Sequence, residues 1–274
     1  MKMEICFHIR KDKMVKLQCH FKAKSLFTPI TIHVLLPSFF AHSTTVETLD
    51  EVYKDNHFSY KTLFLLHGGS EDARSWLSYS NIERYADKHK MAVVLPSVGN
   101  SFYANLAHGP AYWTFLSDEL PRFVRSVFPL SDKREDNFVA GLSMGGYGAF
   151  KWALNKPDQF AAAANLSGLV SFDEPKAPAH IKFDDIFGSV DSIKGSENDV
   201  YALLKQRIEE GTKLPRLYAA CGTEDFTYDD FKKFQKFSKS IAAEITYEEG
   251  PGAHDWDFWD PYIQRVLDWM DPVK

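Results

Sequence analysis

The sequence predicts an α/β domain with a mostly parallel central sheet, antiparallel strands at its N-terminal end and helices on both faces. The chain has 274 residues, of which 45% are hydrophobic and 25% are charged, a composition typical of globular proteins. From residue 61 onward, short apolar runs alternate with amphipathic stretches, and this alternation is typical of parallel sheets. The first sixty residues show instead the period-two pattern of half-buried strands.

Each element follows from a local pattern. Two N-terminal strands are expected at residues 15–21 and 30–36, with a polar loop at 38–60. Strands buried on both faces are expected at 63–66, 92–95, 137–142, 161–166 and 217–221, and a last strand at 244–248. Helices are expected at 75–90, 113–127, 144–155, 200–210, 228–242 and 262–270. One domain covers 1–274, and its irregular stretch at about 171–198 is either a surface excursion or a cap over a pocket.

Composition also excludes several classes of protein. The net charge of −5 gives no basic field for nucleic acid or an anionic membrane. No apolar run is long enough to span a bilayer, and the first residues lack a signal-peptide pattern, so a cytoplasmic location is expected. Three cysteines without paired spacing indicate neither a disulfide framework nor a zinc site. H-E-x-x-H is absent, and we expect no metal and no organic cofactor.

The strongest local signal is a serine between glycines. Residues 141–145 read Gly-Leu-Ser-Met-Gly, with an apolar strand before them and a helix after them. This is the context of a nucleophile elbow, a strained turn that exposes a reactive serine, here Ser143. The alternative is an ordinary serine at the start of a helix.

A serine nucleophile needs a base, and the base needs an acid to orient it. In this kind of fold the chain order is serine, acid, histidine. His254 follows the last expected strand in a glycine-containing loop, whereas the other candidate, His180, lies in the irregular stretch. Asp225 follows the strand at 217–221 and is the preferred acid, with Glu224 as its competitor.

The strand at 63–66 runs into a glycine pair that suits an oxyanion hole. We expect the backbone amides of Gly69 and Met144 to bind a substrate oxyanion, and we interpret His67 as structural. Gly68 is a further residue expected at the substrate pocket, and three aromatic residues in expected loops are candidate pocket walls. These walls are Phe102, Trp113 and Trp256.

Four of these segments together resemble a known family. GLSMGGYGAF at 141–150, LLHGG at 65–69, CGTEDF at 221–226 and GAHDWDFW at 252–259 are similar to motifs of the esterase D-like α/β hydrolases, in particular the bacterial tributyrin esterases. The opening segment KSLFTPITIHVLLP at 24–37 matches the paired early strands of that family. The resemblance implies the α/β-hydrolase fold, activity on short acyl esters and a homodimer or homotetramer. It assigns catalysis to Ser143, Asp225 and His254, and the oxyanion hole to Gly69 and Met144.

These observations predict a serine carboxylesterase that hydrolyses acetyl to butyryl esters through an acyl-enzyme. Its partner is a small-molecule ester, with no nucleic acid and no membrane. One alternative is a thioesterase of the S-formylglutathione hydrolase type, which the continuation Gly69-Ser70-Glu71 disfavours. Others are an intracellular feruloyl or acetylxylan-type esterase and, from a different class, a catalytically silent binding protein with a hydrolase fold.

Overall fold

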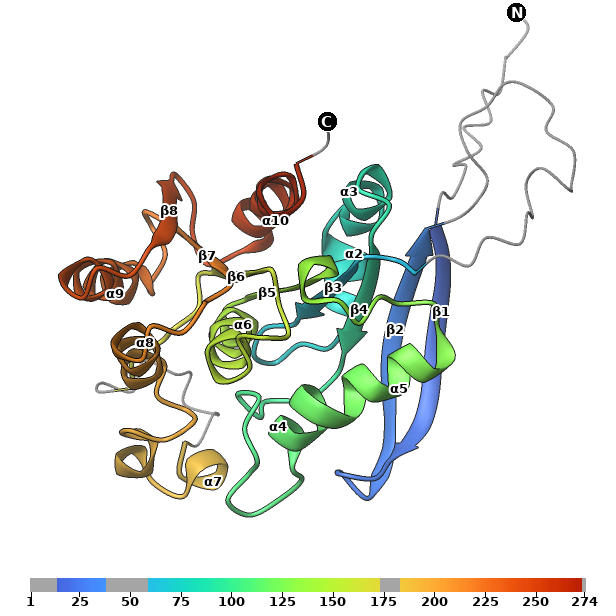
Figure 1. The fold of residues 1–274 in the computed structure, drawn as a ribbon, viewed down its shortest axis with the longest axis horizontal. Helices are drawn as coiled ribbons and strands as arrows, with labels where there is room; N and C mark the ends of the chain where they lie inside the picture. The colour runs from blue at the N-terminus through green and yellow to red at the C-terminus, as the bar shows by residue number, and fades with distance from the viewer. Residues whose placement is uncertain (1–13, 38–58, 173–182, 273–274) are drawn as a thin grey trace, which may run out of the picture.

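An eight-stranded sheet forms the centre of the molecule (Figure 1). The computed structural model describes residues 14–37, 59–172 and 183–272. The strands are β1 (Met14–Ala23), β2 (Thr28–Pro37), β3 (Thr62–Leu66), β4 (Ala92–Pro96), β5 (Asn137–Leu142), β6 (Ala162–Leu166), β7 (Arg216–Gly222) and β8 (Ile245–Gly250). Their order is β1-β2-β4-β3-β5-β6-β7-β8; β1 and β2 pair antiparallel, β2 pairs antiparallel with β4, and all other pairs are parallel. The predicted fold class is therefore confirmed.

Helices cover both faces of this sheet. The helices are α2 (Arg74–Tyr79), α3 (Ile82–Lys88), α4 (Tyr112–Thr114), α5 (Leu120–Val127), α6 (Met144–Asn155), α7 (Phe183–Phe187), α8 (Val200–Glu209), α9 (Tyr228–Ser240) and α10 (Trp256–Met270). Helices α4, α5, α6, α8 and α9 bury apolar side chains on one face, and α2, α3 and α10 on the other. Strands β3 to β7 are buried on both sides apart from the first residue of β7, which explains their continuous apolar sequences.

Three predicted helices differ in the structure, and the third, α10, is described with the candidate active site. The stretch 75–90 forms two helices rather than one, because Asp260 of α10 accepts the Asn81 amide (2.7 Å) and the Ser80 hydroxyl donates to the Trp76 carbonyl (2.6 Å). The stretch 113–127 contains a π-helical segment, Phe115–Glu119, directly before Pro121. Proline has no amide hydrogen to donate, so a wider turn is tolerated there.

The remaining irregular stretch is partly described. Within 171–198, the chain contributes α7 and a short 3-10 helix, Val190–Ile193, while residues 173–182 lie outside the described residues. The loop expected at 38–60 also falls mostly outside them. A cap function for the segment at about 171–198 stays a prediction. So does the assignment of residues 1–274 to one domain.

A buried lysine ties the loop after β4 to α6. Lys151 is fully buried, and its Nζ donates to the carbonyl of Tyr103 (2.8 Å) and lies 4.4 Å from the Trp113 ring centroid. Burial lowers the pKa of this lysine to about 7. The contact holds the left-handed turn at Phe102 and Tyr103 (φ 47° and 53°) against the helix that follows Ser143.

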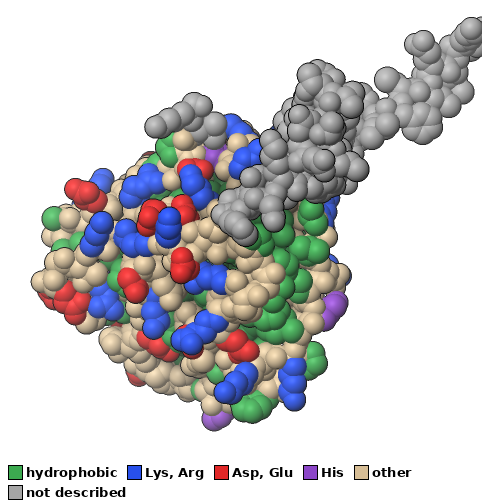
Figure 2. All heavy atoms as spheres, turned by 45° about the vertical axis from the view of Figure 1, so that its right-hand side comes forward, with side chains coloured by type: hydrophobic (Ala, Val, Ile, Leu, Met, Phe, Trp, Pro, Cys, Tyr) green, Lys and Arg blue, Asp and Glu red, His purple; other side chains and the backbone are tan. Residues whose placement is uncertain are grey.

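The outer surface mixes both signs of charge. Figure 2 shows basic and acidic side chains interspersed, with hydrophobic side chains gathered in a band on the side of the molecule that carries β1 and β2. Within the described residues, every helix is too short or too polar to cross a bilayer.

Candidate active site

Ser143 occupies a strained turn between β5 and α6. Its backbone angles are φ 51° and ψ −121°, in a region that residues other than glycine rarely adopt. Its amide donates to the carbonyl of Leu166 (2.8 Å). Its side chain makes no capping hydrogen bond to α6, so the alternative of an ordinary helix-capping serine does not describe this residue.

Glycine is required at positions 141 and 145, on the two sides of this turn, because other backbone atoms leave no room for a Cβ there. A Cβ added to Gly141 would lie 2.3 Å from the carbonyl oxygen of Gly145. A Cβ on Gly145 would lie 2.3 Å from the carbonyl oxygen of Leu66 and 2.7 Å from that of His67. The start of α6 is thus pressed directly against the end of β3, which brings Ser143 beside the expected oxyanion loop.

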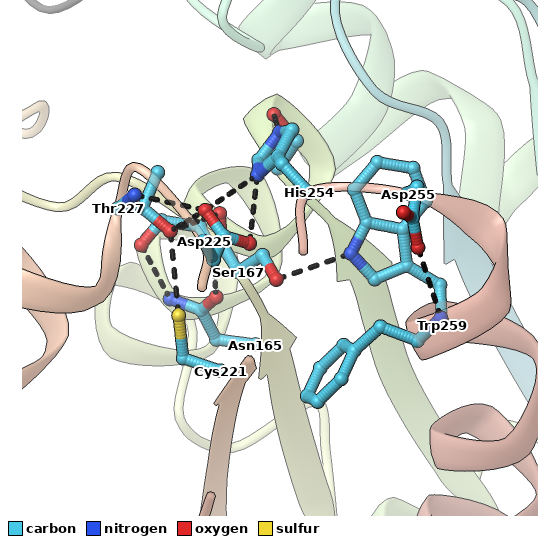
Figure 3. Close-up of polar contacts among 11 residues, drawn as sticks. Asn165, Ser167, Cys221, Asp225, Thr227, His254, Asp255 and Trp259 are labelled. Atoms are coloured by element: carbon cyan, nitrogen blue, oxygen red, sulfur yellow. Dashed lines mark hydrogen bonds and ion pairs between the residues drawn. The ribbon is translucent and has the colours of Figure 1, made fainter. Parts of the chain in front are cut away.

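The structure brings Ser143, His254 and Asp225 together at the carboxyl ends of three strands. The Nε2 atom of His254 lies 2.9 Å from the Ser143 Oγ, and its Nδ1 lies 2.9 Å from both carboxylate oxygens of Asp225. The Asp225 side chain is fully buried, whereas that of His254 is 19% exposed. Figure 3 shows the imidazole above the Asp225 carboxylate.

The two candidate acids differ in their contacts. Glu224 accepts a hydrogen bond from the Gly252 amide (2.6 Å), and its own amide donates to the Gly252 carbonyl (3.0 Å). Glu224 therefore joins the loop after β7 to the loop after β8, and Asp225 is the acid that contacts the imidazole of His254.

Asp225 is held by a set of donors that the sequence analysis did not identify. The amide and the hydroxyl of Thr227 each donate to its Oδ1 at 2.8 Å. The indole of Trp259 donates to the Oγ of Ser167 (3.1 Å), and Figure 3 shows Ser167 between this indole and Asp225. Burial raises the pKa of Asp225, but the hydrogen bond and charge of His254, with the Thr227 amide and Ser167, outweigh it and hold that pKa below its ordinary value. The carboxylate thus stays ionised beside the imidazole.

No local signal marked these supporting residues. Ser167 ends β6 in a left-handed turn (φ 52°), and Trp259 lies in the first turn of α10, which begins earlier than the expected 262–270 because Asp255 caps it by accepting from the Phe258 amide (3.2 Å). Trp256 consequently also lies on a helix, and Trp113 lies in α4, so neither residue is in the loop expected from the sequence.

One amide of the glycine loop after β3 already donates a hydrogen bond within the protein. The amide of Gly68 donates to the Glu71 carboxylate (3.2 Å), whose other oxygen accepts from the Trp256 indole (3.2 Å). Burial raises the pKa of Glu71. Gly69 is the next residue, and Met144 opens α6, where amides lack an acceptor within the helix.

His67 is built into this loop as a structural residue. It is fully buried; its Nδ1 donates to the Gly68 carbonyl (2.7 Å) and its Nε2 accepts from the Val98 amide (3.0 Å). Burial lowers its pKa, and both ring nitrogens are engaged by the backbone in the neutral form.

The aromatic residues proposed as pocket walls differ in their surroundings. Phe102 is buried in a cluster of rings that includes Tyr147, Phe172 and Phe183, and Trp113 is buried against Lys151. The side chain of Trp256 contacts Trp76 and Tyr79 and bonds to Glu71 beside the glycine loop. Gly68 lies against the predicted nucleophile, since a Cβ there would be 3.6 Å from the Ser143 Cβ.

The two described cavities lie apart from these walls. Cavities of about 450 and 430 Å³ are lined by neither Ser143 nor His254, nor by Phe102, Trp113 or Trp256. The pocket assignment of these three aromatic residues and of Gly68 therefore stays a prediction. His180 lies outside the described residues, and among the residues that are described no group of three His, Cys, Asp or Glu side chains is arranged to hold a metal ion.

This geometry can perform one kind of chemistry directly. A neutral imidazole whose Nδ1–H points at a buried carboxylate presents its Nε2 lone pair to the serine hydroxyl. Removal of that proton activates the hydroxyl for attack on an acyl carbon. The fold and the arrangement of these side chains are those of hydrolases that form a covalent acyl-serine.

Comparisons with known proteins agree with this class. The family described as "Putative esterase" matches residues 28–270. An acetyl esterase from Caldicellulosiruptor saccharolyticus is 34% identical over 273 residues, covering 95% of this chain and all of the relative. Among solved structures, the fluorophosphonate-binding serine hydrolase FphF of Staphylococcus aureus superimposes with a TM-score of 0.83 at 37% identity, covering 95% of this chain and 99% of that one. The S-formylglutathione hydrolase FrmB of the same organism gives 0.81 at 38% identity, covering 94% and 98%.

The chain belongs to this esterase family, and the resemblance to the esterase D-like α/β hydrolases is confirmed. It is a carboxylic ester hydrolase.

We predict that Gly145→Ala destabilises the protein by about 3 kcal/mol or more, because the new Cβ meets two backbone carbonyls that no rotamer change can move. The matched control is Gly195→Ala. Gly195 has φ +69° but no atom near its Cβ position, so only the left-handed conformation is penalised, by about 1 kcal/mol. Urea unfolding followed by circular dichroism compares the two. Equal losses in both variants would contradict the close approach of α6 to β3.

Proposed function

We propose that this protein is a serine carboxylesterase for short acyl esters, with Ser143 as nucleophile, His254 as general base and Asp225 as its orienting acid. The observation that carries the proposal is the continuous hydrogen-bond path from the Ser143 hydroxyl through the imidazole to the buried carboxylate, with distances of 2.9 Å at each step. This hydrogen-bond path favours an enzyme over a catalytically silent binding protein, because binding alone does not require it.

In the proposed reaction, His254 takes the proton of Ser143 as its Oγ attacks the ester carbonyl. Asp225 stabilises the imidazolium that forms. The amides of Gly69 and Met144 bind the tetrahedral oxyanion, and the use of the Gly68 amide by Glu71 supports Gly69 as the donor from this loop. His254 then gives its proton to the leaving alcohol. Water next attacks the acyl-serine with His254 again as the base, which releases the acid and restores Ser143.

The acyl preference rests on the acetyl esterase relative, which matches this chain along nearly its whole length. A second candidate function is thioester hydrolysis, because a structure described as an S-formylglutathione hydrolase is 38% identical. Hydrolysis of S-formylglutathione with a higher kcat/KM than any acetate ester would favour that second function. The cytoplasmic location and the homo-oligomeric state stay predictions of the sequence.

Ser143→Ala should lower esterase activity by at least about four orders of magnitude, because the covalent path is lost. The fold should persist, since Ser143 holds its turn through backbone contacts. Ser240→Ala, at the exposed end of α9, is the matched control and should keep full activity. Substantial p-nitrophenyl acetate hydrolysis by purified, folded Ser143→Ala would refute the assigned nucleophile.

Across a series of p-nitrophenyl esters from acetate to palmitate, we expect kcat/KM to peak between acetate and butyrate. Each methylene that fits the acyl site contributes up to about 0.8 kcal/mol, and each one that does not adds strain. A peak at octanoate or beyond would overturn the short-chain assignment and leave the Ser143 mechanism standing.

A further inference from the structure

An exposed aromatic ring lies against the proposed base. Phe226 is 52% exposed, although its neighbours Asp225 and Thr227 are buried at 5% and 2% exposure. The centroid of its ring is 4.3 Å from that of the His254 imidazole, with 47° between the planes. Because Thr227 bonds back to Asp225 through its amide and hydroxyl, the turn that carries Phe226 is fixed. The ring is thus held at the surface and is not free to fold into the core.

The chemistry of the proposed reaction places the leaving group beside the imidazole of His254. The Nε2 atom of His254 delivers a proton to the leaving oxygen, so that oxygen must come within hydrogen-bond distance of it. The carbon atoms attached to the oxygen then lie beside the imidazole. Among the described residues, the other ring in contact with His254 is Trp259 (4.9 Å), which is buried at 5% exposure. Phe226 is thus the exposed one of these two rings next to the proposed base.

Three carboxylates lie on the chain segments next to His254 and Phe226. Glu71 lies between the glycine loop and Trp256, close enough for the charge of His254 to lower its pKa against the larger effect of burial. Glu224 precedes Asp225 and bonds to the amide of Gly252. Asp255, directly after His254, is exposed and caps α10. An acid group on a leaving alcohol would enter a region whose neighbouring side chains carry its own sign of charge, and like charges in proximity repel.

We infer that Phe226 forms a leaving-group subsite that favours esters of uncharged aromatic alcohols and that the flanking carboxylates discriminate against alcohols bearing an acid group. This inference rests on the proposed function, because it uses His254 as the group that protonates the leaving alcohol. It concerns the alcohol part of the ester and is independent of the acyl preference.

The experiment varies the alcohol and keeps the acetyl group constant. Ethyl, cyclohexylmethyl, benzyl and 4-carboxybenzyl acetates are compared by kcat/KM in the wild type, Phe226→Ala, Phe226→Tyr and the control Phe27→Ala. Phe27 is 85% exposed in the turn between β1 and β2. The alcohols have similar acidity, so differences report binding of the alcohol part and not its departure.

We expect the wild type to prefer benzyl over ethyl acetate by roughly tenfold, the range of a favourable aromatic pair with its buried area. Phe226→Ala should remove most of this preference, Phe226→Tyr should restore it, and Phe27→Ala should leave it as in the wild type. In the wild type, 4-carboxybenzyl acetate should be poorer than benzyl acetate by about tenfold, and added salt should reduce that gap.

Two results would overturn the inference: a benzyl-to-ethyl ratio unchanged in Phe226→Ala, including the case of an equal loss for all four esters, or a 4-carboxybenzyl ester as good as the benzyl ester. The last comparison uses the wild type alone and does not depend on how any variant folds. If Ser143→Ala is inactive while the benzyl-to-ethyl ratio is unchanged in Phe226→Ala, only the proposed subsite is refuted. If Ser143→Ala keeps its activity, the proposed function is refuted, and the subsite inference that rests on it is refuted with it.

Discussion

The close approach of the N-terminal end of α6 to the end of β3 is the constraint on which the site depends. Gly145 passes against the carbonyls of Leu66 and His67 with no room for a Cβ. This contact fixes the start of α6 and forces Ser143 into its left-handed turn (φ 51°). It also sets the glycine loop after β3 beside the serine, so the nucleophile and the expected oxyanion donors come from one packing contact.

A second constraint places the proposed base, His254, and its proposed acid, Asp225. The loops after β7 and β8 are cross-linked by hydrogen bonds from Thr223 to the Gly250 carbonyl, from Glu224 to the Gly252 carbonyl and from Gly252 to the Glu224 carboxylate. A Cβ on Gly222 would lie 2.1 Å from the Gly252 carbonyl, so the two loops are in backbone contact. Asp225 and His254 are therefore presented by one rigid unit, and the exposed ring of Phe226 belongs to the same unit.

Much of this arrangement could be predicted because local patterns in the amino-acid sequence determine it. The buried strands are continuous apolar runs, and the glycines around Ser143 mark a turn that requires them. What the sequence did not predict depends on distant contacts. The break between α2 and α3 involves Asp260, 179 residues from Asn81. Thr227 supports Asp225 from nearby in the chain, but the further support from Ser167 and Trp259 depends on the packing of α10 on the sheet. A serine at the end of a strand and a tryptophan near a histidine are common features, so neither one indicates its role by itself.

The most direct test of the account is the site of covalent modification by a fluorophosphonate probe, read by intact mass and peptide mapping. A serine activated by His254 and Asp225 should take up one probe per chain on the peptide that contains Ser143, and labelling should slow strongly in Asp225→Asn, where the imidazole loses its ionised partner. No adduct on the folded wild-type protein, or an adduct confined to another serine, would contradict the central claim that this turn presents an activated nucleophile.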